Sequence, residues 1–188
     1  MTVAFEAFKA AYGRPADASA KKPPKLPAVL EPLAGADIGG VYDDGFISVL
    51  SEREGDGGLG AWTAHLPKGA YLFGSSAFGS LFVATDEELY LVDTQYGQVI
   101  EAEPDVEEFL EITTGPDART DAFHEDLFRR WVEINDALAP TDVLAPTPYL
   151  PLGGSWTLES LKPARLEVYL GLTGQLFGPG TGLEVDYR

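Results

Sequence analysis

Two short apolar runs, separated by only two acidic residues, constrain the fold of this chain more than any other feature of its sequence. The runs are Ser80 to Thr85 (SLFVAT) and Glu88 to Asp93 (ELYLVD). Both are rich in β-branched and aromatic residues, and so short a gap between them predicts a β-hairpin. Ala70 to Phe73 and Gln98 to Ala102 are expected to extend the same sheet, and Phe46 to Leu50 alternates like a further strand. We therefore expect an antiparallel sheet at the centre of the fold.

The pattern becomes helical after Pro104. Asp105 to Ile112 is predicted as a short acidic helix, and Asp117 to Leu138 as a longer one, because its apolar residues recur on one face. Ser155 to Leu161 is expected to make one or two helical turns. Arg165 to Leu170 (RLEVYL) alternates in polarity and is predicted as a strand.

The N-terminal third mixes short helices with connecting segments. Ala4 to Tyr12 has the spacing of an amphipathic helix, and Leu26 to Leu33 is predicted as a second, shorter one. Between them, Pro15 to Pro27 is rich in Pro, Ala and Lys, which predicts an extended surface connector. Gly39 to Gly45 (GGVYDDG) is predicted as a turn. The whole pattern predicts an α+β fold, in which an antiparallel sheet is packed with several helices.

Composition limits where the chain works and what it binds. Cysteine is absent, which excludes disulfides and thiolate metal sites. The N-terminus lacks the basic and apolar regions of a secretory signal, and no segment approaches the roughly 20 apolar residues of a membrane span. We therefore expect a cytoplasmic protein. Its formal net charge of -17 would repel nucleic acid and anionic membranes, and would attract a basic partner.

The negative charge is concentrated between Asp86 and Asp136. This segment has 16 carboxylates and only three arginines. Enzymes use paired carboxylates, not a run of them facing water, and calcium loops need a central Gly that Glu101 to Glu111 lacks. Two interpretations remain, a solvated acidic surface and a surface that captures a basic protein.

Motifs for catalysis or cofactor binding are weak. Gly55 to Gly60 has the spacing of a dinucleotide-binding loop, but that loop requires a following helix, which Pro67 and Gly69 would break. The two histidines, His65 and His124, lie far apart and accompany no nucleophile or zinc motif. We expect no catalytic residue, no metal site and no cofactor.

Two segments resemble the GAD-like immunity proteins of type VI secretion. Tyr71 to Glu101 is similar to the central block of that family, with its Ala-Phe-Gly unit (Ala77 to Gly79), two strands and a turn at Gly97. Pro146 to Leu176 is more similar still, because it contains a Pro-x-Leu-Pro-Leu-Gly-Gly-Ser core at Pro148 to Ser155. This resemblance implies no catalytic motif.

The front of the chain resembles the N-terminal part of the same family over Phe5 to Pro15 and Leu26 to Gly45. The usual Trp-Leu helix before the central block is shortened here to Leu59 to Leu66. The resemblance implies a GAD-like N-terminal part over residues 1–66 and a C-terminal immunity-type α+β part over residues 67–188, in one compact unit. Members of the family look like inhibitors of cognate toxins, with DNA-cleaving nucleases the best-known partners.

Charge and resemblance together predict an immunity protein that covers the basic surface of a secreted toxin with an acidic face. Carboxylates are expected to steer association, and a few aromatic side chains to anchor the complex, although each of these aromatics fits a core position as well. The predicted partner-binding residues are Asp43, Asp44, Glu52, Glu54, Asp56, Glu103, Asp105, Glu107, Glu108, Glu111, Asp121, Glu125, Trp62, Tyr96 and Trp156. Two alternatives stay open: a regulatory module that binds a protein other than a toxin, and a carboxylate-dependent hydrolase.

Overall fold

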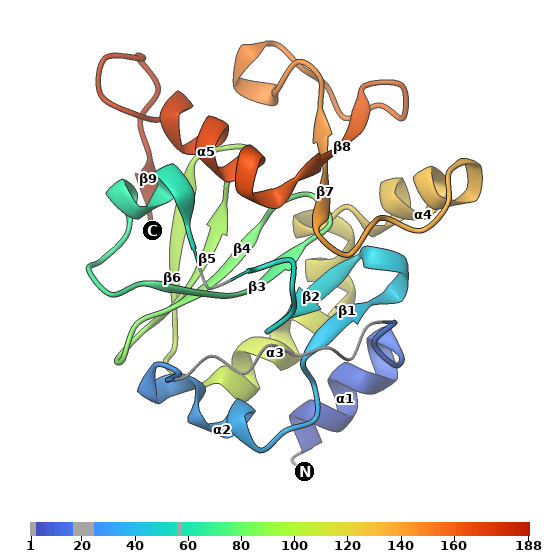
Figure 1. Ribbon diagram of the computed structural model, residues 1–188, viewed down its shortest axis with the longest axis vertical. Coiled ribbons are helices and arrows are strands. Elements are labelled where there is room, and N and C mark those ends of the chain that lie inside the picture. Colours follow the sequence, from blue (N-terminus) through green and yellow to red (C-terminus); the bar gives the residue numbers. More distant parts are fainter. Residues whose placement is uncertain (1–2, 17–24, 56–57) are drawn as a thin grey trace.

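The computed structural model describes residues 3–16, 25–55 and 58–188, and within these residues a seven-stranded sheet forms the centre of the fold (Figure 1). Each strand pairs antiparallel with its neighbour, except that β6 and β9 are parallel. Across the sheet the strands are β1 (Gly40–Tyr42), β2 (Ile47–Val49), β3 (Tyr71–Ser76), β4 (Leu81–Ala84), β5 (Leu89–Asp93), β6 (Gln98–Ala102) and β9 (Asp186–Tyr187). The predicted α+β class is confirmed. Asp56 and most of the predicted connector lie outside the described residues.

The predicted hairpin is present as β4 and β5. Ala84 is paired with Leu89, and the N–H of Thr85 donates to the carbonyl of Glu88 across the turn, at 2.8 Å. The Thr85 hydroxyl accepts a second bond from the N–H of Glu88, at 2.9 Å. Because the turn is closed by its own residues, the hairpin is specified locally.

Helices cover both faces of the sheet (Figure 1). The helices α1 (Val3–Tyr12), α2 (Glu31–Ala34), α3 (Val106–Thr114) and α4 (Glu125–Ile134) contribute side chains to one apolar cluster, and α5 (Leu166–Leu176) to the other. Along β4, Phe82 belongs to the apolar cluster that includes α3, whereas Leu81 and Val83 belong to the cluster that includes α5. This alternation follows from the period of two in a β-strand.

The remaining elements are short. A separate two-stranded sheet pairs β7 (Asp142–Pro146) with β8 (Leu161–Arg165). The 3-10 helices are Ala28–Leu30, Asp43–Gly45, Gly60–His65 and Leu150–Leu152, and Ala118–Ala122 is a π-helix. The pairing of β2 with β3 crosses residue 66, so both predicted parts contribute to one sheet. No described helix is long and apolar enough to cross a membrane.

The predicted strand from Arg165 to Leu170 is wrong. The strand β8 ends at Arg165 and the helix α5 begins at Leu166. The buried residues of α5 include Leu166, Tyr169, Leu170 and Thr173, which follow helical spacing, while Val168 is exposed. A segment of only six residues can fit both the strand period of two and the helix period of 3.6. The pattern of apolar residues over the whole of α5 is needed to distinguish a helix from a strand.

The prediction of one continuous helix from Asp117 to Leu138 is also wrong, because the segment is interrupted. His124 has a left-handed backbone (φ 52°) and separates the π-helix from α4, which ends at Ile134. The break lets Phe123 pack on Phe82, while the His124 ring lies 4.6 Å from that of Trp156. The helical turns predicted from Ser155 to Leu161 are wrong, because only residues 158–160 form a turn and Leu161 begins β8.

Candidate partner-binding surface

The acidic helix α3 begins at a well-defined cap. The carboxylate of Asp105 accepts hydrogen bonds from the N–H groups of Glu107, at 2.9 Å, and Glu108, at 3.2 Å. Acidic side chains in a first turn are favoured by the helix dipole, so these residues support the helix as well as charging its surface. Val106, Phe109, Leu110 and Thr113 are buried toward the sheet. The helix therefore turns its acidic side outward.

A shallow groove runs along the outer side of α3, where α1 packs beside it. Its lining combines acidic side chains with two exposed apolar ones, Val3 (86% exposed) and Ile112 (61% exposed). None of the described residues that line the groove is Lys or Arg. We call this surface the α3 face and define it as Val3, Asp105, Glu107, Glu108, Glu111 and Ile112. The predicted residue Glu103 is exposed but does not line the groove. It offers a basic partner both charge complementarity and an apolar contact.

A second group of predicted acidic residues is tied to arginines of the same chain. Arg129 pairs with Asp43 and, at 3.0 Å, with Glu125, and Arg119 binds the two carboxylate oxygens of Glu125 at 2.8 and 2.5 Å. Burial alone would raise the pKa of Glu125, but these hydrogen bonds outweigh it and lower that pKa. Asp44 and Asp121 remain exposed. The carboxylates of Asp43 and Glu125 thus hold the fold together, which leaves them less available to a partner.

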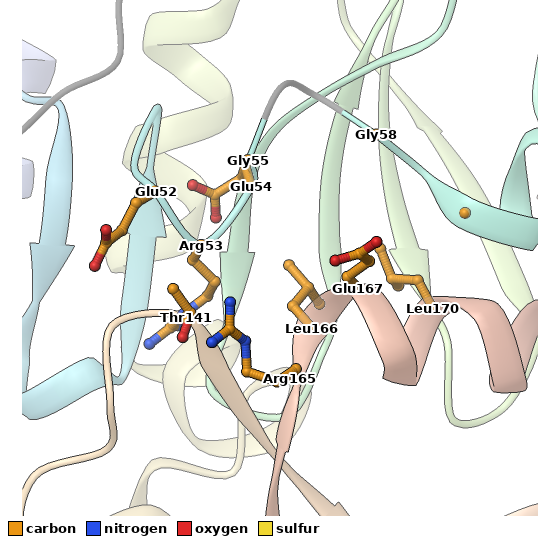
Figure 2. A pocket seen from close by; sticks show the side chains of 11 residues that line it. Glu52, Arg53, Glu54, Gly55, Gly58, Thr141, Arg165, Leu166, Glu167 and Leu170 are labelled. Atoms are coloured by element: carbon orange, nitrogen blue, oxygen red, sulfur yellow. The ribbon is translucent and has the colours of Figure 1, made fainter.

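Glu52 and Glu54 line a cavity of about 490 Å³ between the loop after β2 and the start of α5 (Figure 2). Glu54 is buried and accepts hydrogen bonds from the hydroxyls of Ser48, Ser51 and Ser75. The N–H of Ser51 also donates to it, at 2.9 Å. Glu54 is therefore a core residue in this structure, and Glu52 is half-buried.

The three predicted aromatic anchors have different positions. Trp62 is fully buried, and its indole N–H donates to the hydroxyl of Thr173 at 2.9 Å. Tyr96 is 53% exposed and accepts a hydrogen bond from the indole N–H of the half-buried Trp156, at 3.1 Å. Trp156 also packs on His124, whose pKa is lowered by burial. Of these three residues, Tyr96 and Trp156 leave aromatic surface exposed to solvent, and Trp62 does not.

Several residues that shape these surfaces were not predicted. Val3 and Ile112 are exposed apolar side chains of the α3 face, and Ile112 lies off the buried stripe of its helix, a sign that was readable in the sequence. Arg53 and Arg165 both line the cavity of Figure 2, although they are 112 positions apart in the sequence. No sequence pattern joins them. Among the described residues, no group of three or more His, Asp or Glu side chains is placed to hold a metal ion.

Comparisons with known proteins place this geometry in context. The crystal structure of Atu4351 from Agrobacterium tumefaciens superposes with a TM-score of 0.66 at 15% sequence identity, covering 91% of this chain and 88% of that one. This likeness is one of fold. No curated protein matches the chain in sequence. Residues 103–177, which include most of the α3 face and all of α5, match the family model of the C-terminal part of the type VI secretion immunity protein Tdi1. The predicted resemblance to immunity proteins of type VI secretion is thereby confirmed over residues 103–177.

Proposed function

We propose that this chain is an immunity protein that binds a cognate toxin of type VI secretion and neutralises it by binding alone. The observation that carries the proposal is the match of residues 103–177 to the C-terminal part of the immunity protein Tdi1. The charge of the chain supports it independently, because a protein with a net charge of -17 is suited to a basic partner.

The α3 face is the proposed contact surface. Its carboxylates, among them Glu107, Glu108 and Glu111, surround the exposed side chains of Val3 and Ile112. We propose a nuclease as the toxin, because an enzyme that binds DNA phosphates carries a basic surface that acidic side chains can cover. The complex would then exclude DNA from that surface.

Charge and apolar contact would act on different steps of binding. Exposed carboxylates at a rim accelerate association, and their effect falls with added salt. Apolar side chains that become buried in the complex mainly slow its dissociation. Val3 and Ile112 are placed to do this on the α3 face, and the Tyr96–Trp156 pair offers a second aromatic contact.

The test is co-expression of this chain with the product of the adjacent gene, with toxicity and complex formation both measured. We expect a complex that abolishes toxicity. The triple variant Glu107→Lys, Glu108→Lys, Glu111→Lys should weaken the complex at least about tenfold and restore toxicity, because it places three cations on the face that meets a basic toxin.

The matched control reverses three other exposed carboxylates, as Glu133→Lys, Glu159→Lys and Glu184→Lys. It changes the net charge by the same amount, so a loss confined to the first triple assigns the contact to the α3 face. Equal losses in both triples would contradict the α3 face as the contact surface. Absence of any complex and of protection would refute the immunity function itself.

A further inference from the structure

The cavity at the start of α5 differs from the α3 face, because arginines as well as glutamates line it. Two arginines line it, Arg53 from the loop after β2 and Arg165 at the end of β8. Figure 2 shows both side chains directed toward the region of Thr141, where the two segments meet. Neither residue belongs to the proposed toxin-binding surface.

Arg53 is a buried cation with incomplete pairing. It is only 4% exposed, and it donates from Nε to the carbonyl of Pro140, at 3.1 Å, and from Nη2 to that of Gly45, at 2.8 Å. Its Nη1 has no hydrogen-bond partner. Over the described residues it forms no ion pair, since the neighbouring Glu54 is occupied by serines. Buried charges are normally paired directly, whereas the carboxylates of Glu54 and Asp142 act on this guanidinium without a direct ion pair.

Burial lowers the pKa of Arg53 to about 10, in spite of the opposing charges of Glu54 and Asp142. The group thus stays charged at neutral pH.

The start of α5 adds a second attraction for negative charge. The first N–H groups of a helix have no partner inside it, and the helix dipole places positive potential there. The N–H of Leu166 donates to the carbonyl of Thr141 at 3.1 Å, but no side chain caps this helix. The residue at the cap is Arg165, whose side chain is 65% exposed and meets Asp142 only at 3.9 Å. It can turn over a bound group without breaking a close ion pair.

Glycines form the wall opposite α5. Gly55, Gly58 and Gly60 line the cavity, and a side chain on Gly60 would come within 3.2 Å of the Gly171 backbone nitrogen. Glycine at position 60, with a φ of 56°, therefore lets this segment lie close to α5. Three glutamates also line the cavity: Glu52, Glu54, which is bound by serine hydroxyls, and Glu167 in the first turn of α5. Figure 2 shows the Glu52 carboxylate pointing away from Arg165.

We infer that this cavity is a binding site for an anionic group, a carboxylate or a phosphate, held by Arg165 and the N-terminus of α5 with Arg53 beneath them. Entry of the anion gives Nη1 of Arg53 the hydrogen-bond acceptor that it lacks, after a small shift of the side chains that cover it. The anion is either a free small molecule or an acidic side chain of the bound toxin, and only the second source rests on the proposed function.

The first arm of the test measures thermal unfolding of the free protein in sodium phosphate and in sodium acetate, against sodium chloride of equal ionic strength. A free anion should raise Tm saturably, by about 4 °C at roughly thirty times its Kd. The variant Arg165→Gln should lose this rise, while Lys162→Gln, an exposed cation of the same strand, should keep it.

The second arm compares the toxin affinities of Arg165→Gln and Lys162→Gln at one salt concentration. A tenfold or greater loss in Arg165→Gln alone, without any anion effect on Tm, assigns the site to an acidic side chain of the toxin. The inference is overturned when neither phosphate nor acetate stabilises the wild type and the two variants bind toxin equally. If no toxin binds at all, the proposed function fails. The thermal unfolding measurements then test the anion site by themselves.

Discussion

Glu54 and Arg53 are adjacent in the sequence and both are buried, yet they do not form an ion pair with each other. Glu54 is bound by Ser48, Ser51 and Ser75, and Arg53 by two backbone carbonyls. The Glu54 carboxylate is thus satisfied by neutral dipoles, whereas the Arg53 guanidinium donates to two carbonyls and its Nη1 has no partner. At the scale of the residue, these serines explain why an acidic side chain is tolerated inside the fold.

Replacement of Glu54 should therefore be costly. Glu54→Ala leaves three hydroxyls and one backbone N–H without their acceptor, and we expect a loss of about 3 kcal/mol in the free energy of unfolding. Urea denaturation followed by tryptophan fluorescence measures it. The half-buried neighbour serves as the control, and Glu52→Ala should cost less than about 0.5 kcal/mol. Similar values for both variants would show that the serine network contributes little.

At the scale of the element, α4 is attached to the β1–β2 turn through Arg129. This side chain bridges Asp43 of the turn and Glu125 of its own helix, and its guanidinium lies 5.9 Å from the centre of the Phe46 ring. Phe128, on the same helix, packs against Phe46 from within the core. Ion pairs and apolar contacts together thus fix α4 against the β1–β2 turn.

Arg129→Ala should lower the free energy of unfolding by about 1 kcal/mol. The estimate is modest because the Arg129 side chain is partly exposed and solvent screens its ion pairs. Arg130→Ala is the matched control, since Arg130 is the next residue and is exposed, and we expect a change within about 0.5 kcal/mol. Chemical denaturation of the two variants side by side checks this, and equal effects would argue against the bridge.

At the scale of the whole molecule, the acidic α3 face and the cavity beside α5 lie on opposite sides of the sheet. The α3 face collects carboxylates on one side of the sheet, and the cavity lined by both arginines and glutamates lies beside α5, which packs on the other side (Figure 1). A net charge of -17 gives the molecule a long-range attraction for a basic toxin, while the two surfaces differ in the groups they can hold at short range.

The net negative charge predicts how the complex responds to salt. Between 0.05 and 0.5 M NaCl, the association rate constant with the toxin should fall at least about tenfold, because screening removes the long-range attraction. The dissociation rate should change less, since buried apolar contacts are insensitive to screening. Stopped-flow measurements of both rates separate the two effects. An association rate independent of salt would exclude electrostatic steering.

Local patterns in the sequence were sufficient where an element is specified by its own residues. The hairpin of β4 and β5 is closed by Thr85 and Glu88, and α1 and α3 show their buried stripes and, for α3, its cap. The acidic character of the α3 face follows directly from composition, because charged side chains on a helix whose apolar stripe is buried must face outward.

Only the tertiary structure decided the features that depend on distant partners. The segment Leu166–Leu176 is helical because its apolar side chains meet the sheet and Trp62, and His124 interrupts a helix because Trp156 and Phe78 pack on its ring. Glu54 is buried because Ser75, on the next strand of the sheet, supplies a hydroxyl beside Ser48 and Ser51. Arg53 and Arg165 line the same cavity because β8 leads into α5 beside the loop after β2. Periodicity and capping act over a few residues, whereas burial and charge pairing depend on which surfaces the folded chain brings together.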